Sequence, residues 1–503
     1  MERLQDNNAT VELEALYKTL PVEMSSEISL PDYRSEISRL LWVRPTVMPA
    51  VRFLRGGVMD FSGRICYQVL YAGPDGRLYA FEHEDGYAFS LPVDGQDITE
   101  SAVEVTPDVV IGRVAAPRKM TVRCRAHARV RAYKEKNLGL SLSAREEADA
   151  CLLGGVAECG KLRSATGEIF ELTDELLVET AGNLRVISAR GDVFMPEAVA
   201  GSGYVHCRGE AVVTLLCAAE TEGEERVFST VRRVPFEEDL PLEGVTGDWA
   251  ASGYATVGEI RVDVEDCKVL LSFDVTPTVQ ATCQQPIYYV KDVLLPGHVT
   301  VGRRTEEQLW VPTACGNRNF SLALNGKTRE LGMPTGALVV DAFADASIRE
   351  AQQEARGTAL SGELCAHVLY RLGEEYGTFD AVMPFRVVTD GEVGVRDVCC
   401  RVPLLRVRAE NDTLYADAEM ALAVCAARDE TCAPLGEVRF EPQKEERRGD
   451  VELYYPTKGE TLWQVGKRYA CSPEELAKIN GLSPDALDDA DALSGVRYLL
   501  VSL

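Results

Sequence analysis

The segment SGRICYQVLY, residues 62–71, has two counterparts later in the chain: RGEAVVTLLC at residues 208–217 and SGELCAHVLY at residues 361–370. In each segment a glycine precedes a short run of mostly apolar residues. A short apolar run bounded by turn residues is typical of a β-strand. A glycine at the start of such a run marks a bulge or the close approach of another group. The three segments therefore predict a β unit that the chain repeats.

The order of features around these segments is shared as well. The anchor glycines are Gly63, Gly209 and Gly362, and a phenylalanine follows each of them in the next strand-like segment, at Phe89, Phe236 and Phe385. Each unit closes with a long alternating segment: MTVRCRAHARVRAY at 120–133, KVLLSFDVTPTV at 268–279 and TLYADAEMALAV at 413–424. We predict that the phenylalanine fills the same place in each unit and that alternate residues of the closing segment face one core.

The repeat predicts a mainly β protein made of tandem β-sandwich-like units, followed by a small domain of two strands and two helices. We expect an N-terminal helical segment at 1–28, a first β repeat at 29–133, a second repeat with its connector at 134–283 and a third with its connector at 284–432. The connectors are too long to be bare loops, so they should hold the first strands of the next unit. A charged linker is expected at 433–450 and the small domain at 451–503.

Composition narrows the range of functions. A chain of 503 residues is too long for one core, and 46% hydrophobic with 26% charged residues is ordinary for globular protein. The formal net charge of -26 argues against nucleic acid as a partner, because phosphates would repel the protein. No run of about eighteen apolar residues predicts a transmembrane helix.

The start of the chain and its cysteines predict a cytoplasmic protein. The segment MERLQDNNATVELEALYKTLPVEM carries early charges and has no apolar run typical of a secretory signal. There are 15 cysteines, an odd number without a regular framework, and several occupy apolar positions of predicted strands, such as Cys124 and Cys217. In a reducing compartment such thiols behave as small hydrophobic side chains.

The C-terminal domain has two helix start signals. The residues Thr461-Leu462-Trp463-Gln464 fit a capping box, in which the threonine hydroxyl accepts from the glutamine amide and the glutamine reaches back. The residues Ser472-Pro473-Glu474-Glu475 fit a second helix start, with proline and acidic residues in the first turn. Strand-like segments, LYY and VRYLLV, flank the two helices, so a β-α-α-β domain is expected.

The order YYPTKGETLWQVGKRY, then SPEELAKINGL, then a strand resembles the LysM family over residues 451–503. The resemblance implies a shallow groove that binds glycans containing N-acetylglucosamine. Carried over to this sequence, one side of the groove would be the turn Gly459, Glu460, Thr461 and Leu462, and the other side the loop Asn480, Gly481 and Leu482. The segment DDADALSGVRYLL stands where the family usually has a Pro-Gly-Gln-like turn, so the second wall of the groove is acidic here.

The β part resembles the SPOCS family of endospore-forming bacteria, on the leader Leu30-Pro31-Asp32-Tyr33 and the strand from Gly63 to Tyr71. With a terminal LysM domain, this resemblance implies a non-enzymatic spore coat assembly factor on the mother-cell side, recruited to the forespore surface. Its LysM domain would dock a coat-scaffold ATPase-type protein, among other coat proteins. The alternative is a peptidoglycan- or N-acetylglucosamine-glycan-binding protein of the cell wall or spore cortex, and a LysM-bearing hydrolase is a third possibility.

No catalytic, metal or cofactor motif stands out in the sequence. The five histidines are isolated, and no cysteine lies in a peptidase-like setting, so we expect no enzyme, no metal and no cofactor. One segment, TVRCRAHARVRAY, has a basic face on an acidic protein, formed by Arg123, Arg125, Arg129 and Arg131. This stripe either docks an acidic partner or pairs with carboxylates of the same chain.

Overall fold

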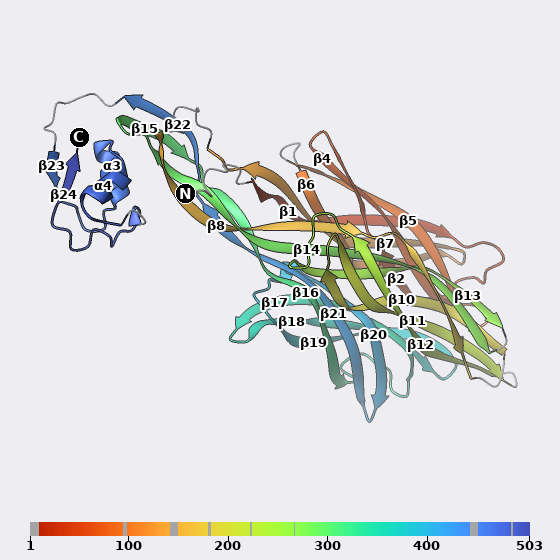
Figure 1. The fold of residues 1–503 in the computed structure, drawn as a ribbon. Coiled ribbons are helices and arrows are strands. Elements are labelled where there is room, and N and C mark those ends of the chain that lie inside the picture. The colour runs from red at the N-terminus through yellow and green to blue at the C-terminus, as the bar shows by residue number, and fades with distance from the viewer. Residues whose placement is uncertain are drawn as a thin grey trace.

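Strands make up most of the computed structural model, and two short helices lie near its C-terminus (Figure 1). The structure describes residues 10–93, 98–140, 149–179, 183–221, 224–265, 267–442, 451–483 and 486–502. Three successive two-sheet units precede the small C-terminal domain, which confirms the predicted mainly β architecture of tandem sandwich-like units.

The first sandwich consists of two antiparallel sheets. Its strands are β1 (Thr10–Ser29), β2 (Arg39–Val47), β3 (Val51–Arg55), β4 (Val58–Ala72), β5 (Leu78–Pro92), β6 (Ile98–Ala116) and β7 (Lys119–Asn137). One sheet has the order β1-β7-β6, and in the other β2, β3 and β5 all pair with β4. Tyr67 and Val69 from β4 meet Met120 and Val122 from β7 in the core between the sheets.

The second and third sandwiches have the same plan. The second contains β8 (Cys151–Thr166), β9 (Phe170–Leu177), β10 (Asn183–Ala200), β11 (Tyr204–Thr221), β12 (Glu224–Pro241), β13 (Ala250–Glu265) and β14 (Lys268–Leu294). The third contains β16 (Glu307–Lys327), β17 (Leu338–Glu354), β18 (Gly357–Leu372), β19 (Glu375–Thr389), η1 (Val395–Asp397), β20 (Val398–Glu410) and β21 (Thr413–Cys432). In every unit the first strand pairs with the last, giving β1-β7, β8-β14 and β16-β21, so each unit closes on itself.

The anchor glycines of the second and third sandwiches lie at equivalent places in the central strands β11 and β18. Phe236 lies directly opposite Gly209, and Phe385 lies directly opposite Gly362. A Cβ at either glycine would come within 2.9 Å of the phenylalanine ring. Glycine is therefore needed there because an aromatic ring covers the strand at that point.

In the first sandwich a different aromatic residue takes this place. Tyr87, rather than the predicted Phe89, lies opposite Gly63, and a Cβ at Gly63 would come within 2.4 Å of the tyrosine side chain. Phe89 lies opposite Phe61 instead, with ring centroids 4.9 Å apart. The prediction for the first unit was therefore two residues too far along the strand. Tyr87 and Phe89 lie on the same face of β5. The register of β5 on β4 therefore decides which of the two rings covers Gly63.

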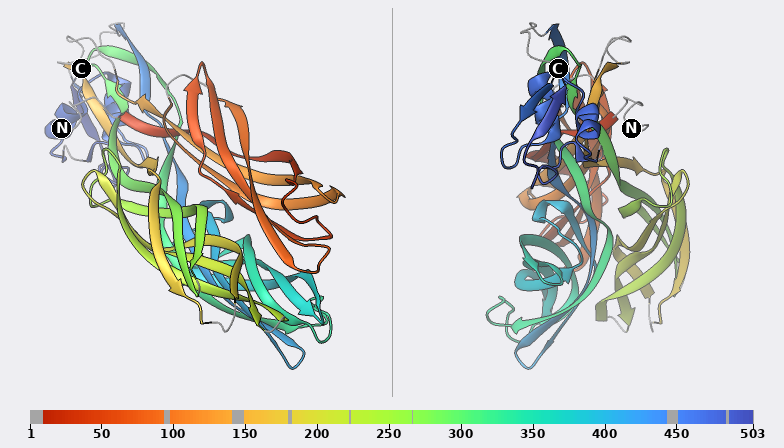
Figure 2. Two further views of the ribbon diagram at one scale, coloured as in Figure 1. Left: turned by 90° about the vertical axis from the view of Figure 1, so that its right-hand side faces the viewer. Right: turned by 60° about the vertical axis from the view of Figure 1, so that its left-hand side comes forward.

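The three sandwiches pack against one another side by side (Figure 2). A cluster of buried residues takes members from all three: Leu41, Trp42, Leu70 and Leu78 from the first, Ile187, Leu216 and Ala218 from the second, and Phe343, Leu369 and Tyr376 from the third. The rings of Trp42 and Phe343 lie edge to face with centroids 5.2 Å apart. The body is thus one packed unit rather than three sandwiches in a row.

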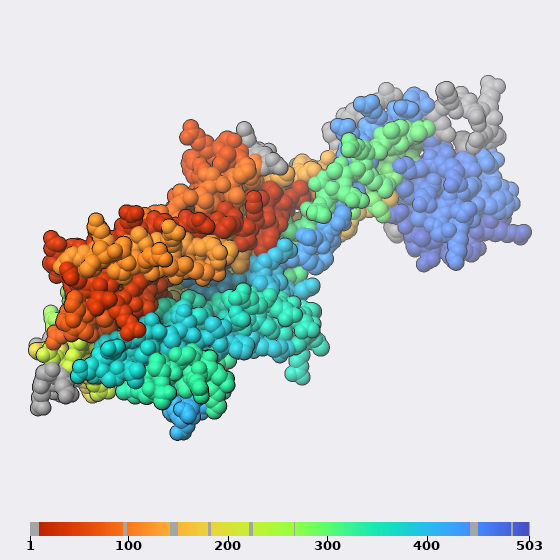
Figure 3. All heavy atoms as spheres, turned by 180° about the vertical axis from the view of Figure 1, so that it is seen from behind, coloured from red at the N-terminus to blue at the C-terminus, as the bar shows by residue number. Residues whose placement is uncertain are grey.

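A narrow stalk connects this body to the C-terminal domain (Figures 1 and 3). It consists of residues 151–156 of β8, residues 288–294 of β14, and the antiparallel pair β15 (His298–Arg304) and β22 (Leu435–Pro442). Leu140, Val290, Val293 and Leu435 form its small buried core.

The C-terminal domain contains β23 (Val451–Tyr454), α3 (Leu462–Tyr469), α4 (Pro473–Ile479) and β24 (Leu499–Ser502). The two strands pair antiparallel, so the domain has the predicted β-α-α-β order. Leu462, Val465 and Leu476 are buried between the helices and the sheet. No helix in the described part of the chain is long and apolar enough to cross a membrane.

Two expectations about the ends of the body were wrong. Residues 1–28 were expected to be helical, but residues 10–29 form strand β1, which pairs along its length with β7 from Thr10↔Asn137 to Ser29↔Lys119. Residues 1–9 lie outside the described residues. Residues 433–450 were expected to be a linker, but residues 435–442 form β22 of the stalk, and residues 443–450 lie outside the described part. In both places a partner strand far away in the sequence supplies the backbone hydrogen bonds.

Candidate functional site

The first helix of the C-terminal domain begins as its sequence predicts. The Thr461 hydroxyl accepts a hydrogen bond from the Gln464 amide at 3.3 Å, and the Thr461 amide donates to Gln464 Oε1 at 3.2 Å. The second helix begins with Ser472, whose hydroxyl accepts from the Glu475 amide at 3.3 Å. These caps satisfy amides that no helical carbonyl reaches, and they fix the turn that precedes α3.

Glu460 holds that turn from the inside. Its buried carboxylate accepts hydrogen bonds from the Tyr454 hydroxyl at 2.8 Å and the Thr457 amide at 3.0 Å, and it forms an ion pair with Arg468 at 2.9 Å. Burial alone would raise the pKa of Glu460, but these hydrogen bonds and the charge of Arg468 outweigh it, so its pKa is lowered. Glu460 is therefore part of the frame of the turn.

Asn480 has the same role on the other side. Its side chain accepts a hydrogen bond from the Leu500 amide at 2.7 Å and donates to the Leu500 carbonyl at 2.9 Å and to the Leu476 carbonyl at 2.8 Å. One side chain thus joins the end of α4 to strand β24. This arrangement leaves Asn480 little capacity to bind a ligand.

The predicted groove residues divide into a buried frame and two exposed turns. Leu462 is fully buried, and Leu482 packs against the same cluster. Gly459 and Gly481 are exposed and have positive φ values of 80° and 67°. These glycines form tight turns that other residues adopt only with strain. A ligand would therefore meet the backbone of the two glycine turns rather than the side chains between them.

The structure adds two exposed tyrosines to the candidate binding residues. Tyr455 and Tyr498 are 62% and 50% exposed, and the register that pairs Tyr454 with Leu499 places them at one end of the β23–β24 pair, on its outward face. Ile479, at the end of α4, is 51% exposed. The two-residue period of a strand is the sequence signal that could indicate these tyrosines. In the Tyr454-Tyr455 pair only one side chain can face the core, so the other must be exposed.

The acidic loop between α4 and β24 contacts both the domain and the stalk. The Leu487 carbonyl accepts a hydrogen bond from the Trp463 amide at 2.9 Å, and Asp488 pairs with Lys291 of β14 at 2.6 Å. Asp489 and Asp491 are exposed. The loop therefore presents negative charge beside the point where the domain contacts the stalk.

The contact between domain and stalk centres on Asp292 of β14, which is 5% exposed. Its carboxylate accepts a hydrogen bond from Trp463 Nε1 at 3.0 Å and pairs with Lys467 at 2.7 Å. The Gly297 amide also donates to the Ala470 carbonyl at 2.8 Å. Trp463 is thus used to attach the domain, and its buried ring is not available to stack on a sugar.

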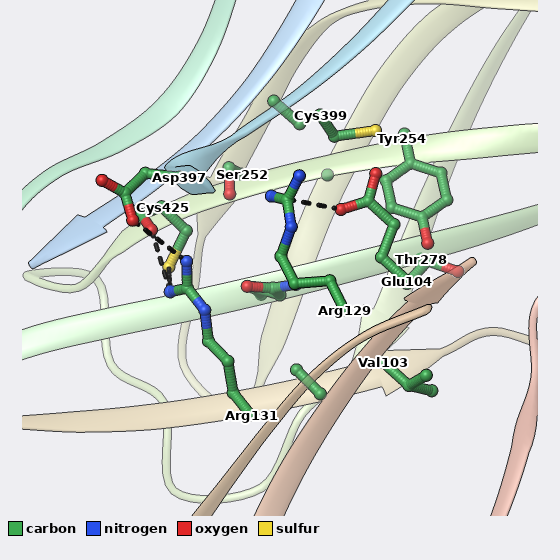
Figure 4. Close-up of a pocket in the computed structure, with 14 residues that line it drawn as sticks. Val103, Glu104, Arg129, Arg131, Ser252, Tyr254, Thr278, Asp397, Cys399 and Cys425 are labelled. Carbon is green, nitrogen blue, oxygen red and sulfur yellow. Dashed lines mark hydrogen bonds and ion pairs between the residues drawn. The ribbon is translucent and has the colours of Figure 1, made fainter. Parts of the chain in front are cut away.

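The basic stripe of β7 divides along its length, and Figure 4 shows the end with Arg129 and Arg131. Arg131 is buried, donates to the Cys425 carbonyl at 3.0 Å and pairs with Asp397 at 3.2 Å. Arg129 pairs with Glu104 at 3.6 Å and donates to the Val398 carbonyl at 3.2 Å. This end of the stripe joins the first sandwich to the third. The cavity beside it has a volume of about 30 Å³, room for about two water molecules.

The other end of the stripe faces outward. Arg125 pairs with Asp108 of β6 at 2.7 Å, and Arg123 is exposed. Since three of the four arginines pair within the chain, only a short basic segment is presented to a partner.

A comparison with protein families matches residues 457–488 to the LysM domain. None of the curated proteins and none of the solved structures compared matches the chain. The match begins just before the Gly459 turn and ends at Asp488, so it covers both turns, both helices and the beginning of the acidic loop. The C-terminal domain is therefore a LysM domain.

Proposed function

We propose that the protein binds a glycan containing N-acetylglucosamine through its LysM domain, without catalysing a reaction. The observation that carries this proposal is the family match over residues 457–488, on a domain with the β-α-α-β order and two exposed glycine turns. The large β body then serves as a support that presents the domain at the end of the stalk.

The exposed groups of the domain suit a sugar chain. At Gly459 and Gly481 nothing lies within 4 Å of the place where a side chain would begin, so hydroxyl and acetamido groups of a sugar can approach the backbone of these turns. Tyr455 and Tyr498 offer aromatic surface beside a polar hydroxyl, a combination common at binding surfaces that are partly wet. Glu460 and Asn480 act indirectly in this proposal, since they hold the two turns in place.

The test is sedimentation of the full chain with purified peptidoglycan and with chitin. Wild-type protein is expected in the pellet, and Tyr455→Ala and Tyr498→Ala are each expected to weaken binding at least about fivefold, since an important aromatic contact contributes more than about 1 kcal/mol. Tyr33→Ala is the matched control, because Tyr33 is 83% exposed in the first sandwich, outside the LysM domain. Equal sedimentation of all four proteins would show that Tyr455 and Tyr498 do not contribute to binding. If the wild-type protein does not sediment with either glycan, glycan binding is contradicted.

A second candidate is that the LysM domain docks a protein of the spore coat, a coat-scaffold ATPase-type protein above all. The observation that favours it is the acidic loop with Asp488, Asp489 and Asp491 in place of the family's usual turn. In this case the chain acts in the mother-cell cytosol at the forespore surface. A tagged chain imaged in sporulating cells, with and without residues 451–503, tests it: the candidate predicts a ring around the forespore that the truncated chain loses.

A further inference from the structure

The third sandwich carries a cluster of metal-binding side chains on the outward face of its β17-β18-β19 sheet. Cys365 and His367 are two residues apart in β18, so both point to the same face. Asp380 of β19 lies directly opposite His367, and Asp345 of β17 lies directly opposite Cys365. The core of the sandwich takes the alternate residues of β18 instead.

The geometry of three of these side chains is that of a metal site. The ligand atoms of Cys365, His367 and Asp380 all lie within 4.8 Å of one another. His367 Nδ1 is 2.7 Å from Asp380 Oδ1. Tetrahedral Zn²⁺, with bonds of 2.0–2.3 Å, holds its ligand atoms roughly 3.5 Å apart, so small side-chain movements suffice to surround an ion.

The imidazole ring is held in a suitable orientation by its other contacts. His367 Nε2 lies 3.3 Å from Asp345 Oδ2, and the ring stacks on Phe343 with centroids 4.7 Å apart. A histidine that binds a metal through one nitrogen usually donates its other N–H to a carboxylate, which fixes the ring and increases its basicity as a ligand. Asp345 is placed for that second role, which leaves Nδ1 for the ion.

We propose that Cys365, His367 and Asp380 bind a divalent metal ion of the Zn²⁺ class, with Asp345 as a positioning residue. A thiolate, an imidazole and a carboxylate form a mixed set that suits Zn²⁺, whereas Mg²⁺ and Ca²⁺ prefer oxygen ligands alone. The side chains of Asp380 and Asp345 are 64% and 72% exposed, so an ion can enter from solvent and water can take the fourth position.

The second sandwich provides a natural control. His206 of β11 lies directly opposite Asp239 of β12, with Nδ1 2.7 Å from Asp239 Oδ1, the same distance as in the His367–Asp380 pair. Two residues along β11, on the same face, are Tyr204 and Arg208 rather than a cysteine. The two pairs therefore share the histidine–carboxylate contact and differ in the thiol.

The experiment uses the full chain, which is first freed of metal. The metal-free protein is then titrated with Co²⁺ under reducing conditions. Cobalt bound by a thiolate gives a charge-transfer band in the near ultraviolet, and tetrahedral cobalt gives strong visible bands. Wild-type protein is expected to show both with one equivalent of metal, and Zn²⁺ should displace the cobalt. Cys365→Ser should lose the thiolate band, and His367→Ala should lose both sets of bands.

Matched variants make the result decisive. Asp345→Asn is expected to keep the spectrum and weaken affinity about 10–100-fold, as loss of a positioning carboxylate does. His206→Ala should leave the spectrum and the affinity unchanged. Circular dichroism verifies that each variant is folded. If His367→Ala does not fold, Asp380→Asn replaces it as the second variant that lacks a ligand. A wild-type protein without the thiolate band, or a Cys365→Ser variant that retains it, would overturn the proposal.

Discussion

The sandwiches and the LysM domain are stabilised by different kinds of contact. The second sandwich buries a broad apolar core that includes Val269, Leu271, Phe273 and Val275 on alternate positions of β14. The LysM domain has a core of few residues, and its turns are held by polar side chains, above all Glu460 and Asn480. A domain of about fifty residues buries too small a fraction of its surface to rely on apolar packing alone.

This difference places the candidate glycan surface on the more fragile part of the molecule. The two turns that carry it are fixed by single side chains, so one substitution can disturb a turn without unfolding the body. The stalk compensates in part, because Asp292 accepts hydrogen bonds from Trp463 and Lys467 and so adds contacts that the domain lacks within itself.

The largest effect is expected in the apolar core of a sandwich. Phe273→Ala removes a fully buried ring, and it should lower the free energy of unfolding of the body by about 3–5 kcal/mol. Denaturant unfolding of the full chain measures the change. The control is Phe53→Ala, since Phe53 is 65% exposed on β3 and should shift the transition by less than about 0.5 kcal/mol. Similar shifts for the two variants would contradict the account of the core.

A smaller loss of stability is expected when the hydrogen bonds of the Asn480 side chain in the LysM domain are removed. Asn480→Ala leaves the Leu500 amide and carbonyl without their partner, and it should cost about 1–3 kcal/mol. Hydrogen exchange of residues 451–502 should accelerate while exchange in the sandwiches stays the same. Asn325→Ala, on an exposed position of β16, is the control. If hydrogen exchange in the LysM domain is unchanged in Asn480→Ala, the apolar core alone is enough to stabilise the domain.

The helix cap of α3 should contribute less again. Thr461→Ala removes the acceptor of the Gln464 amide and is expected to cost about 1 kcal/mol, whereas Thr461→Ser should retain most of the stability. The same exchange measurement, restricted to residues 457–470, distinguishes the two variants. Equal effects of alanine and serine would mean that the hydroxyl does not cap the helix.

The smallest expected effect is a loss of stability of the LysM domain at acidic pH. The pKa of Glu460 is lowered in the folded domain, so the folded state binds fewer protons at this group than the unfolded state. The stability that this group contributes is present above the ordinary carboxyl pKa of about 4.3, and it is lost as pH falls through the lower folded value. Protection factors, which are exchange rates corrected for the intrinsic effect of pH, should fall for residues 451–502 between about pH 5 and pH 3, and Glu460→Gln should reduce this dependence.

The sequence predicted what depends on local pattern. Alternation in segments such as 268–279 predicted strands, the glycine segments predicted the repeat, and Thr461-Leu462-Trp463-Gln464 predicted the helix cap that the structure contains. These features are set by side chains close together in the sequence.

What the sequence could not predict depends on distant partners. Residues 10–29 became a strand because β7 pairs with them, and Tyr87 rather than Phe89 covers Gly63 because of the register of β5 on β4. The contact of Asp292 with Trp463 joins residues from two domains. In the candidate groove, the family pattern named residues that turned out to hold the turns, while the exposed Tyr455 and Tyr498 are visible only when the faces of β23 and β24 are assigned.

Glycan binding is tested most directly by a calorimetric titration of the full chain with a soluble oligomer of N-acetylglucosamine. We expect saturable binding by one site per chain, with an affinity that falls in Tyr498→Ala and is unchanged in Tyr33→Ala. An absence of binding by wild-type protein, with the LysM domain shown to be folded by hydrogen exchange, would contradict it.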